Sequence, residues 1–123
     1  MPAPDFYRKP YGPGWALVGD AGHLKDSITA QGISDAFQDA ERCSHALHDV
    51  FSGARAFEDA MRDYQRRRDY HVRSMFEFTC QFATLEAPPL DLQRLLSAIA
   101  GNQQAMDRFA QMNAGTISPA EFF

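Results

Sequence analysis

Cysteine is scarce in this 123-residue chain, long apolar runs are missing, and basic residues are outnumbered by acidic ones. Two cysteines cannot build a disulfide scaffold, so we expect a reducing, cytoplasmic compartment. No window approaches the roughly 18 apolar residues of a membrane-spanning helix, and no signal peptide is recognisable. Twelve Lys and Arg against sixteen Asp and Glu leave a net charge of −4, which argues against a nucleic-acid surface.

Helical periodicity dominates from Gly32 onward, where apolar residues recur at steps of three and four. The stripe of the first helix comprises Ile33, Ala36, Phe37, Ala40, Cys43, Leu47, Val50 and Phe51. Gly53 is a suitable stop, and a long helix is predicted over about 54–84. Further helices are predicted over 90–100, after an Asn102 cap, and after a capping box at Ser118 to Glu121.

A single strand is predicted before these helices. Residues 1–14 are rich in Pro and Gly and look loop-like, whereas Trp15 to Val18 is typical of a strand buried on both faces of a parallel sheet. No second strand signal follows, so this strand has no predicted neighbour within the chain. The predicted fold is mainly α, with about four helices and one short N-terminal strand.

The predicted organisation is one compact unit that is a fragment of a larger α/β protein. Its N-terminal part, residues 1–34, would hold the strand and a ligand-binding loop, and residues 35–123 would form the helical region. In such a parent protein the strand would find its missing neighbours in a parallel sheet of Rossmann type.

The segment after the predicted strand has the features of a ligand site. Asp20 follows the strand's C-terminal end, where open α/β sheets bind ligands, and its carboxylate can accept hydrogen bonds from sugar or ribityl hydroxyls. Gly19 and Gly22 let a ligand approach the backbone. Gly32 opens a helix whose free N–H groups suit an anion or a carbonyl oxygen.

This segment resembles the second FAD-binding fingerprint of flavoprotein monooxygenases and related oxidoreductases, which include aromatic hydroxylases, halogenases and geranylgeranyl-reductase-like enzymes. The matching residues are Gly19-Asp20-Ala21-Gly22-His23, Gln31-Gly32 and Asp39-Ala40. Later stretches, such as Tyr64 to Asp69, Met75 to Cys80 and the ending Glu121-Phe122-Phe123, resemble a bacterial subgroup. Ser27 replaces the family's loop proline, and Thr29 or Ala30 replaces a frequent loop glycine.

The resemblance implies an FAD site and an oxidoreductase activity. Asp20 would bind the ribityl part of FAD, and the backbone from Ala30 to Ile33 would face the flavin ring or the pyrophosphate. The full set of expected cofactor contacts is Gly19, Asp20, Ala30, Gln31, Gly32 and Ile33. NAD(P)H would reduce the flavin, and the substrate would be a small organic molecule. No catalytic acid or base is recognisable in the sequence. Flavin chemistry often needs none beyond positioning, because the cofactor carries the redox step.

The first fingerprint of such enzymes, a Gly-x-Gly-x-x-Gly turn between a strand and a helix, does not occur in this sequence. Because that turn cradles the pyrophosphate, we expect this chain alone to bind FAD weakly or not at all.

Several other residues have competing interpretations. His23 is expected near the cofactor edge rather than as an acid or base. His45 and His48, with Glu41 and Asp49, have helical spacing but are expected to be solvated, so no metal site is predicted. The basic run from Arg66 to Arg68 is expected to form exposed i,i+4 pairs with interleaved acids. His71 has no assigned role.

A non-enzymatic alternative is a helical module that self-associates. A strand without a partner and aromatic-rich stripes would expose apolar surface in a monomer, which favours a homo-oligomer. The size of the protein at low concentration and the binding of flavin distinguish the two hypotheses.

Overall fold

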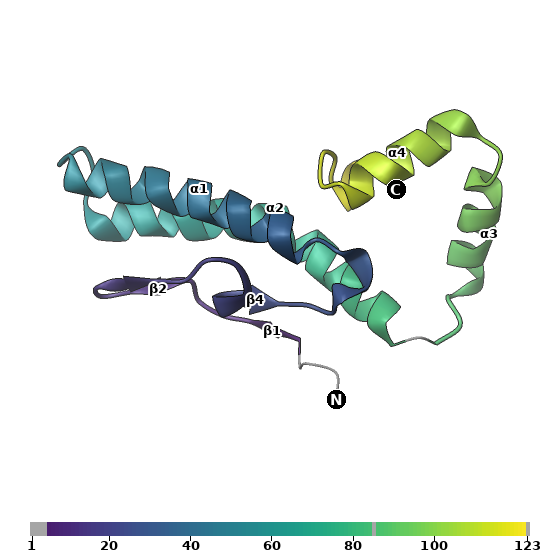
Figure 1. The fold of residues 1–123 in the computed structure, drawn as a ribbon, viewed down its shortest axis with the longest axis horizontal. Coiled ribbons are helices and arrows are strands. Elements are labelled where there is room, and N and C mark those ends of the chain that lie inside the picture. Colours follow the sequence, from purple (N-terminus) through teal and green to yellow (C-terminus); the bar gives the residue numbers. More distant parts are fainter. Residues whose placement is uncertain (1–4, 85, 123) are drawn as a thin grey trace.

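The computed structural model describes residues 5–84 and 86–122, and this part of the chain is mainly helical, as predicted (Figure 1). Residues 1–4 of the predicted N-terminal loop and the terminal Phe123 lie outside the described residues. The helices are α1 (Gly32–Phe51), α2 (Phe57–Ala83), α3 (Leu90–Ile99), α4 (Gln103–Asn113) and α5 (Pro119–Phe122). The strands are β1 (Phe6–Tyr7), β2 (Tyr11–Gly12), β3 (Trp15–Ala16) and β4 (His23–Leu24), and short 3-10 turns cover Gly19–Ala21 (η1) and Ser27–Thr29 (η2).

The helix boundaries agree with the signals in the sequence. Gly53 has a positive φ of 75° just after α1, as a helix-ending glycine requires. Asn102 caps α4, since its side-chain oxygen accepts the Ala105 N–H at 3.2 Å. Ser118 and Glu121 form the predicted reciprocal capping box, with bonds of 2.7 and 3.2 Å.

The predicted doubly buried strand at Trp15 to Val18 is wrong. Only Trp15–Ala16 is extended in a ladder, and it pairs antiparallel with Tyr11–Gly12. The turn between them is Pro13-Gly14, in which Gly14 has a φ of 78°, as a tight reversal after proline demands. Trp15 is 47% exposed, so this strand has a partner in its own chain and an exposed face.

A second short ladder was also not predicted. Residues Phe6–Tyr7 pair antiparallel with His23–Leu24. Together with Tyr11–Gly12, the N-terminal segment predicted to be a loop therefore contributes two strands. Both ladders are only two residues long, too short to leave an alternating pattern in the sequence. They lie along one side of the α1–α2 pair (Figure 1).

The core lies between α1, α2 and the β2–β3 hairpin. It contains Tyr11, Cys43, Ala46, Ala60, Met61 and Tyr64, with Ala16, Leu47, Val50 and Phe57 packed against it. Tyr64 also donates a 2.7 Å hydrogen bond to the Leu17 carbonyl, which ties α2 to the hairpin. The predicted stripe of α1 is therefore correct at Cys43, Leu47 and Val50, whereas Phe51 is 85% exposed.

In the N-terminal half of α1 the prediction is wrong, because the polarity is reversed. Ile33 and Phe37 are 76% and 75% exposed, whereas Asp35 and Asp39 are buried. The buried acids face the segment from Gly19 to Lys25, which supplies polar partners for both. Helical spacing alone cannot show which face meets such a polar neighbour.

The remaining helices form a C-terminal arm, made of α3, α4 and residues 114–122. The arm leaves the end of α2 and turns back toward the start of α1 (Figure 1). There the Gln31 amide donates a 2.6 Å hydrogen bond to the Asn113 carbonyl. Among the described helices, none has both the length and the apolar character to cross a membrane.

Candidate functional site

The predicted cofactor segment begins with a tight turn at Gly19 and Asp20, the Gly19–Asp20 turn. Gly19 has a φ of 55°, and a Cβ placed on it would lie 2.8 Å from the Ala36 side chain. Both observations require glycine, because an L-residue would be strained and would collide with α1. The Gly22 N–H donates to the Gly19 carbonyl at 2.8 Å and closes the turn.

The turn places Asp20 beside the first residue of α1. Asp20 is exposed, and its Oδ1 lies 3.7 Å from the position that a Cβ on Gly32 would occupy. No side chain caps the N-terminus of α1. A carboxylate next to free helix N–H groups forms a mixed site that can accept hydrogen bonds from ligand hydroxyls and donate them to ligand oxygens.

The loop before α1 brings only some of the predicted contacts to this surface. Gly32 and Ile33 are exposed there with Asp20. The Gln31 side chain is instead buried, accepts from Lys25 Nζ at 3.3 Å and donates to the Asn113 carbonyl. Ala30 is exposed and adopts a φ of 53°, in the left-handed region that favours glycine.

Beneath the turn lies a buried polar pair. Asp39 is fully buried, and its Oδ2 accepts the Gly19 N–H at 3.1 Å and pairs with His23 Nε2 at 2.9 Å. His23 was expected at the cofactor edge, but its ring is 3% exposed and points into the protein. Sequence spacing did not reveal this pair, because its partners are 16 residues apart on a loop and a helix.

One turn earlier on α1, Asp35 forms a second buried ion pair. Lys25 Nζ lies 2.5 Å from Asp35 Oδ2, and both side chains are almost completely buried. The pair joins the loop after β4 to α1 and also holds the Gln31 side chain through Lys25. These contacts fix the loop conformation from below while leaving Gly32 and Ile33 exposed.

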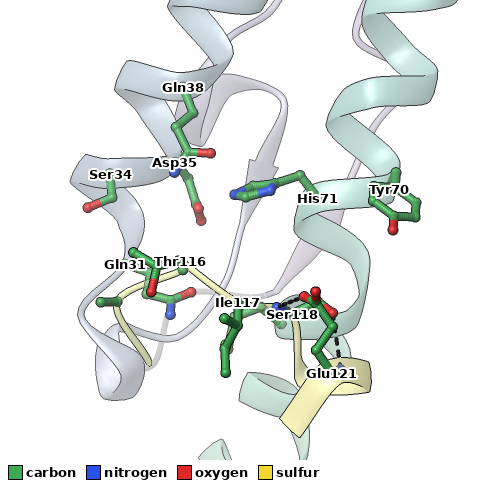
Figure 2. A pocket seen from close by; sticks show the side chains of 13 residues that line it. Gln31, Ser34, Asp35, Gln38, Tyr70, His71, Thr116, Ile117, Ser118 and Glu121 are labelled. Carbon is green, nitrogen blue, oxygen red and sulfur yellow. Dashed lines mark hydrogen bonds between the residues drawn. The ribbon is translucent and has the colours of Figure 1, made fainter. Parts of the chain in front are cut away.

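A cleft lies on the neighbouring face, between α1, α2 and the C-terminal arm. It has a volume of about 140 Å³, and Asp20 is not among its lining residues. Figure 2 shows the His71 ring directed from α2 toward Asp35, with Ile117 and the Ser118–Glu121 capping box on the opposite side. Burial is the main cause that lowers the pKa of His71, and the Arg42 guanidinium lowers it further. The neutral form of His71 is therefore favoured.

The basic run on α2 is only partly exposed. Arg66 and Arg67 pair with Asp63 at 2.5 and 2.9 Å, as expected for an exposed helix. Arg68 is 1% exposed, so its expected exposed pair is wrong: it donates to Asp69 at 2.7 Å and to the Arg8 carbonyl at 2.9 Å. Its buried position follows from the β1 strand, which covers this face of α2.

The histidines on α1 do not form a metal site with their neighbours. His45, His48 and Glu41 are exposed. Within residues 5–84 and 86–122, no three His, Cys, Asp or Glu side chains lie close enough together to hold a metal ion.

Comparison with known proteins gives one distant relative. No family model matches the chain, and no solved structure matches it. The chain is 31% identical over 101 residues to the 3-demethoxyubiquinol 3-hydroxylase of Escherichia coli (strain K12), a match that covers 74% of this chain and 25% of that protein. The chain thus spans about a quarter of the relative's length, and the likeness is to a hydroxylase of monooxygenase type.

Proposed function

We propose that this chain forms one wall of the FAD site of an oxidoreductase of monooxygenase type that acts on a small organic substrate. The observation that carries the proposal is the exposed Asp20 carboxylate held beside the uncapped N-terminus of α1. The fingerprint resemblance and the distant likeness to a hydroxylase support the same chemistry.

The exposed residues fit one edge of a flavin nucleotide. Asp20 would accept a hydrogen bond from a ribityl hydroxyl, and the N–H groups of Gly32 and Ile33 would donate to flavin or phosphate oxygens. Gly32 leaves space for this approach, because only Asp20 Oδ1 lies within 4 Å of where its Cβ would be. Gly19 and Ala30 would shape the backbone, and Gln31 would contribute its backbone rather than its side chain.

Bound FAD would supply the redox step, with NAD(P)H as the reductant and O2 as the second substrate of the whole enzyme. The protein groups described above would bind and orient the isoalloxazine and its ribityl chain. The apolar side chains of Ile33 and Phe37, exposed on α1, would lie next to this nucleotide and limit the access of water.

The test is an NMR titration of this chain with millimolar FAD, which detects weak binding. We expect shifts confined to the amides of Gly19, Asp20, Gly32 and Ile33. Asp20→Ala should weaken binding about tenfold or more, because a charge-assisted hydrogen bond is lost. Asp91→Ala is the control, since Asp91 is an exposed acid in the first turn of α3. Shifts confined to another surface, or equal affinities for Asp20→Ala and the native chain, would refute the proposal.

Self-association is the second candidate, and the exposed Ile33 and Phe37 favour it. The unpaired strand that first suggested it does not exist, since Trp15–Ala16 pairs with Tyr11–Gly12. Sedimentation at low and high concentration decides the matter. A dimer that Phe37→Ser dissociates would support it, and a monomer at every concentration would exclude it.

A further inference from the structure

The Gly19–Asp20 turn is anchored from α1 by one buried carboxylate. Asp39 Oδ2 makes hydrogen bonds with both the Gly19 N–H and His23 Nε2. A single oxygen therefore holds the turn and the strand that follows it. With Gly19 seated against Ala36, the turn has little room to shift along α1.

The same turn is linked to α2 through the His23 ring, which packs on Tyr7. The His23 ring stacks on Tyr7, with centroids 5.9 Å apart. The Tyr7 hydroxyl donates to Asp69 Oδ1 at 2.9 Å, and the Arg68 guanidinium lies 4.6 Å from the Tyr7 ring and also binds Asp69. His23 is therefore linked directly to α1 through Asp39 and indirectly to α2 through Tyr7.

Stability alone would not favour a buried carboxylate at position 39. Asp39 Oδ1 is buried without a hydrogen-bond partner in the described part of the chain, and it lies 3.8 Å from Arg42 NH1, which also has none. A buried charge with an unsatisfied oxygen is costly, and an apolar residue of similar volume is often at least as stable. The Asp39 carboxylate is explained if its hydrogen bonds fix the geometry of the Gly19–Asp20 turn, which an apolar side chain could not do.

We propose that Asp39 and His23 are positioning residues, which set the Asp20 carboxylate at the N-terminus of α1. The inference deepens the proposed function and rests on it for its biological role. Its structural content, that Asp39 controls where Asp20 lies, is separate and can be measured without flavin.

The flavin-free experiment compares Asp39→Ala with Asp35→Ala, a matched change of a buried acid one turn earlier on α1. We expect Asp39→Ala to raise the exchange rate of the Gly19 amide about tenfold or more and to abolish the NOE between Asp20 and Gly32. Asp35→Ala should leave the exchange of the Gly19 amide unchanged, because Asp35 bonds to Lys25 and not to the turn. Native-like Gly19 exchange and NOE in Asp39→Ala would overturn the inference.

Substitutions of His23 provide a second route if Asp39→Ala does not fold. His23→Gln keeps a donor at the position of Nε2 and should retain the Asp20–Gly32 NOE, whereas His23→Leu should lose it. Loss of the NOE in both variants, or in neither, would contradict a role based on the bond to Asp39.

A double-mutant cycle then links the positioning to flavin. We expect Asp39→Ala to weaken FAD binding about tenfold in the native background and to have no further effect in Asp20→Ala. An equal loss in both backgrounds would mean that Asp39 acts through general stability. If Asp20→Ala and the native chain bind FAD equally while the NOE still depends on Asp39, the proposed function fails and the control of Asp20 by Asp39 stands.

Discussion

The two halves of α1 are held to the protein by different forces. The C-terminal half buries Cys43 and Ala46 against Met61 and Tyr64 of α2, an ordinary apolar contact. The N-terminal half buries Asp35 in an ion pair with Lys25 and Asp39 in hydrogen bonds to the turn, and it directs Ile33 and Phe37 outward. A single helix thus changes from an apolar packing element to the polar support of the Gly19–Asp20 turn within a few turns.

The comparison separates two ways of holding a helix in place. Apolar packing is tolerant of small shifts, whereas buried hydrogen bonds and ion pairs are directional and fix specific atoms. The polar half lies directly beneath the Gly19–Asp20 turn and the loop at Ala30 to Ile33, which are the segments expected to contact the cofactor. Functional sites commonly accept such a cost in stability in return for geometry.

The largest expected effect comes from breaking the ion pair of the polar half. Lys25→Met leaves the Asp35 carboxylate buried without its cation and should lower the free energy of unfolding by about 3 to 4 kcal/mol. Urea unfolding measures the loss. The control is Arg62→Met, whose pair with Asp59 is exposed and should cost less than about 1 kcal/mol. Equal losses would mean that burial of the Lys25 pair is unimportant.

A truncation in the apolar half should cost slightly less. Met61 is fully buried, and Met61→Ala should lower the free energy of unfolding by about 3 kcal/mol through lost contacts and a cavity. Met106→Ala, at a position that is 45% exposed, is the control and should change it by less than about 0.5 kcal/mol. Calorimetry of the three proteins checks the prediction, and a loss below about 1 kcal/mol at Met61 would contradict the assigned core.

A smaller gain is expected in the loop that joins the two regions. Ala30→Gly removes the strain of a left-handed alanine and should raise the free energy of unfolding by about 0.5 kcal/mol, net of the extra freedom of the unfolded chain. Ala114→Gly is the control, because Ala114 has a φ of −78° and gains nothing from glycine. Destabilisation at Ala30 would show that its backbone is not strained in solution.

The smallest effect concerns the cleft beside the polar half. Since the pKa of His71 is lowered from its ordinary 6.5, the unfolded chain binds the proton more readily than the folded one. The contribution of His71 to stability is full above pH 6.5 and is lost as the pH falls from there through the lowered pKa. The difference in stability between the native protein and His71→Gln should shrink over that window, and a difference that grows on acidification would refute the pKa direction.

Much of the fold could be predicted because it depends on local signals. Gly53, Asn102 and the Ser118–Glu121 box determine where helices end or begin through contacts a few residues away. The Tyr11–Ala16 hairpin was not predicted, because the unbroken apolar run from Trp15 to Val18 favours a buried strand, although Pro13-Gly14 is a recognised turn pair.

The candidate site was harder to predict, since its supports are distant in sequence. The positions of Gly19, Asp20 and Gly32 near one another follow from the resemblance, but the roles of His23 and Arg68 depend on partners 16 and 60 residues away. Charge and spacing gave no reason to bury Arg68 while Arg66 and Arg67 stay in solvent. Only the covering β1 strand distinguishes them.

The bond from Gln31 to the Asn113 carbonyl has a consequence for the order of folding. It joins positions 82 residues apart, so its formation requires closure of a long stretch of chain and carries a larger entropic cost than the α1–α2 hairpin. We expect the hairpin to assemble first and the C-terminal arm to dock last. During synthesis, the loop at Ala30 to Ile33 would then reach its final shape only after Asn113 has been made.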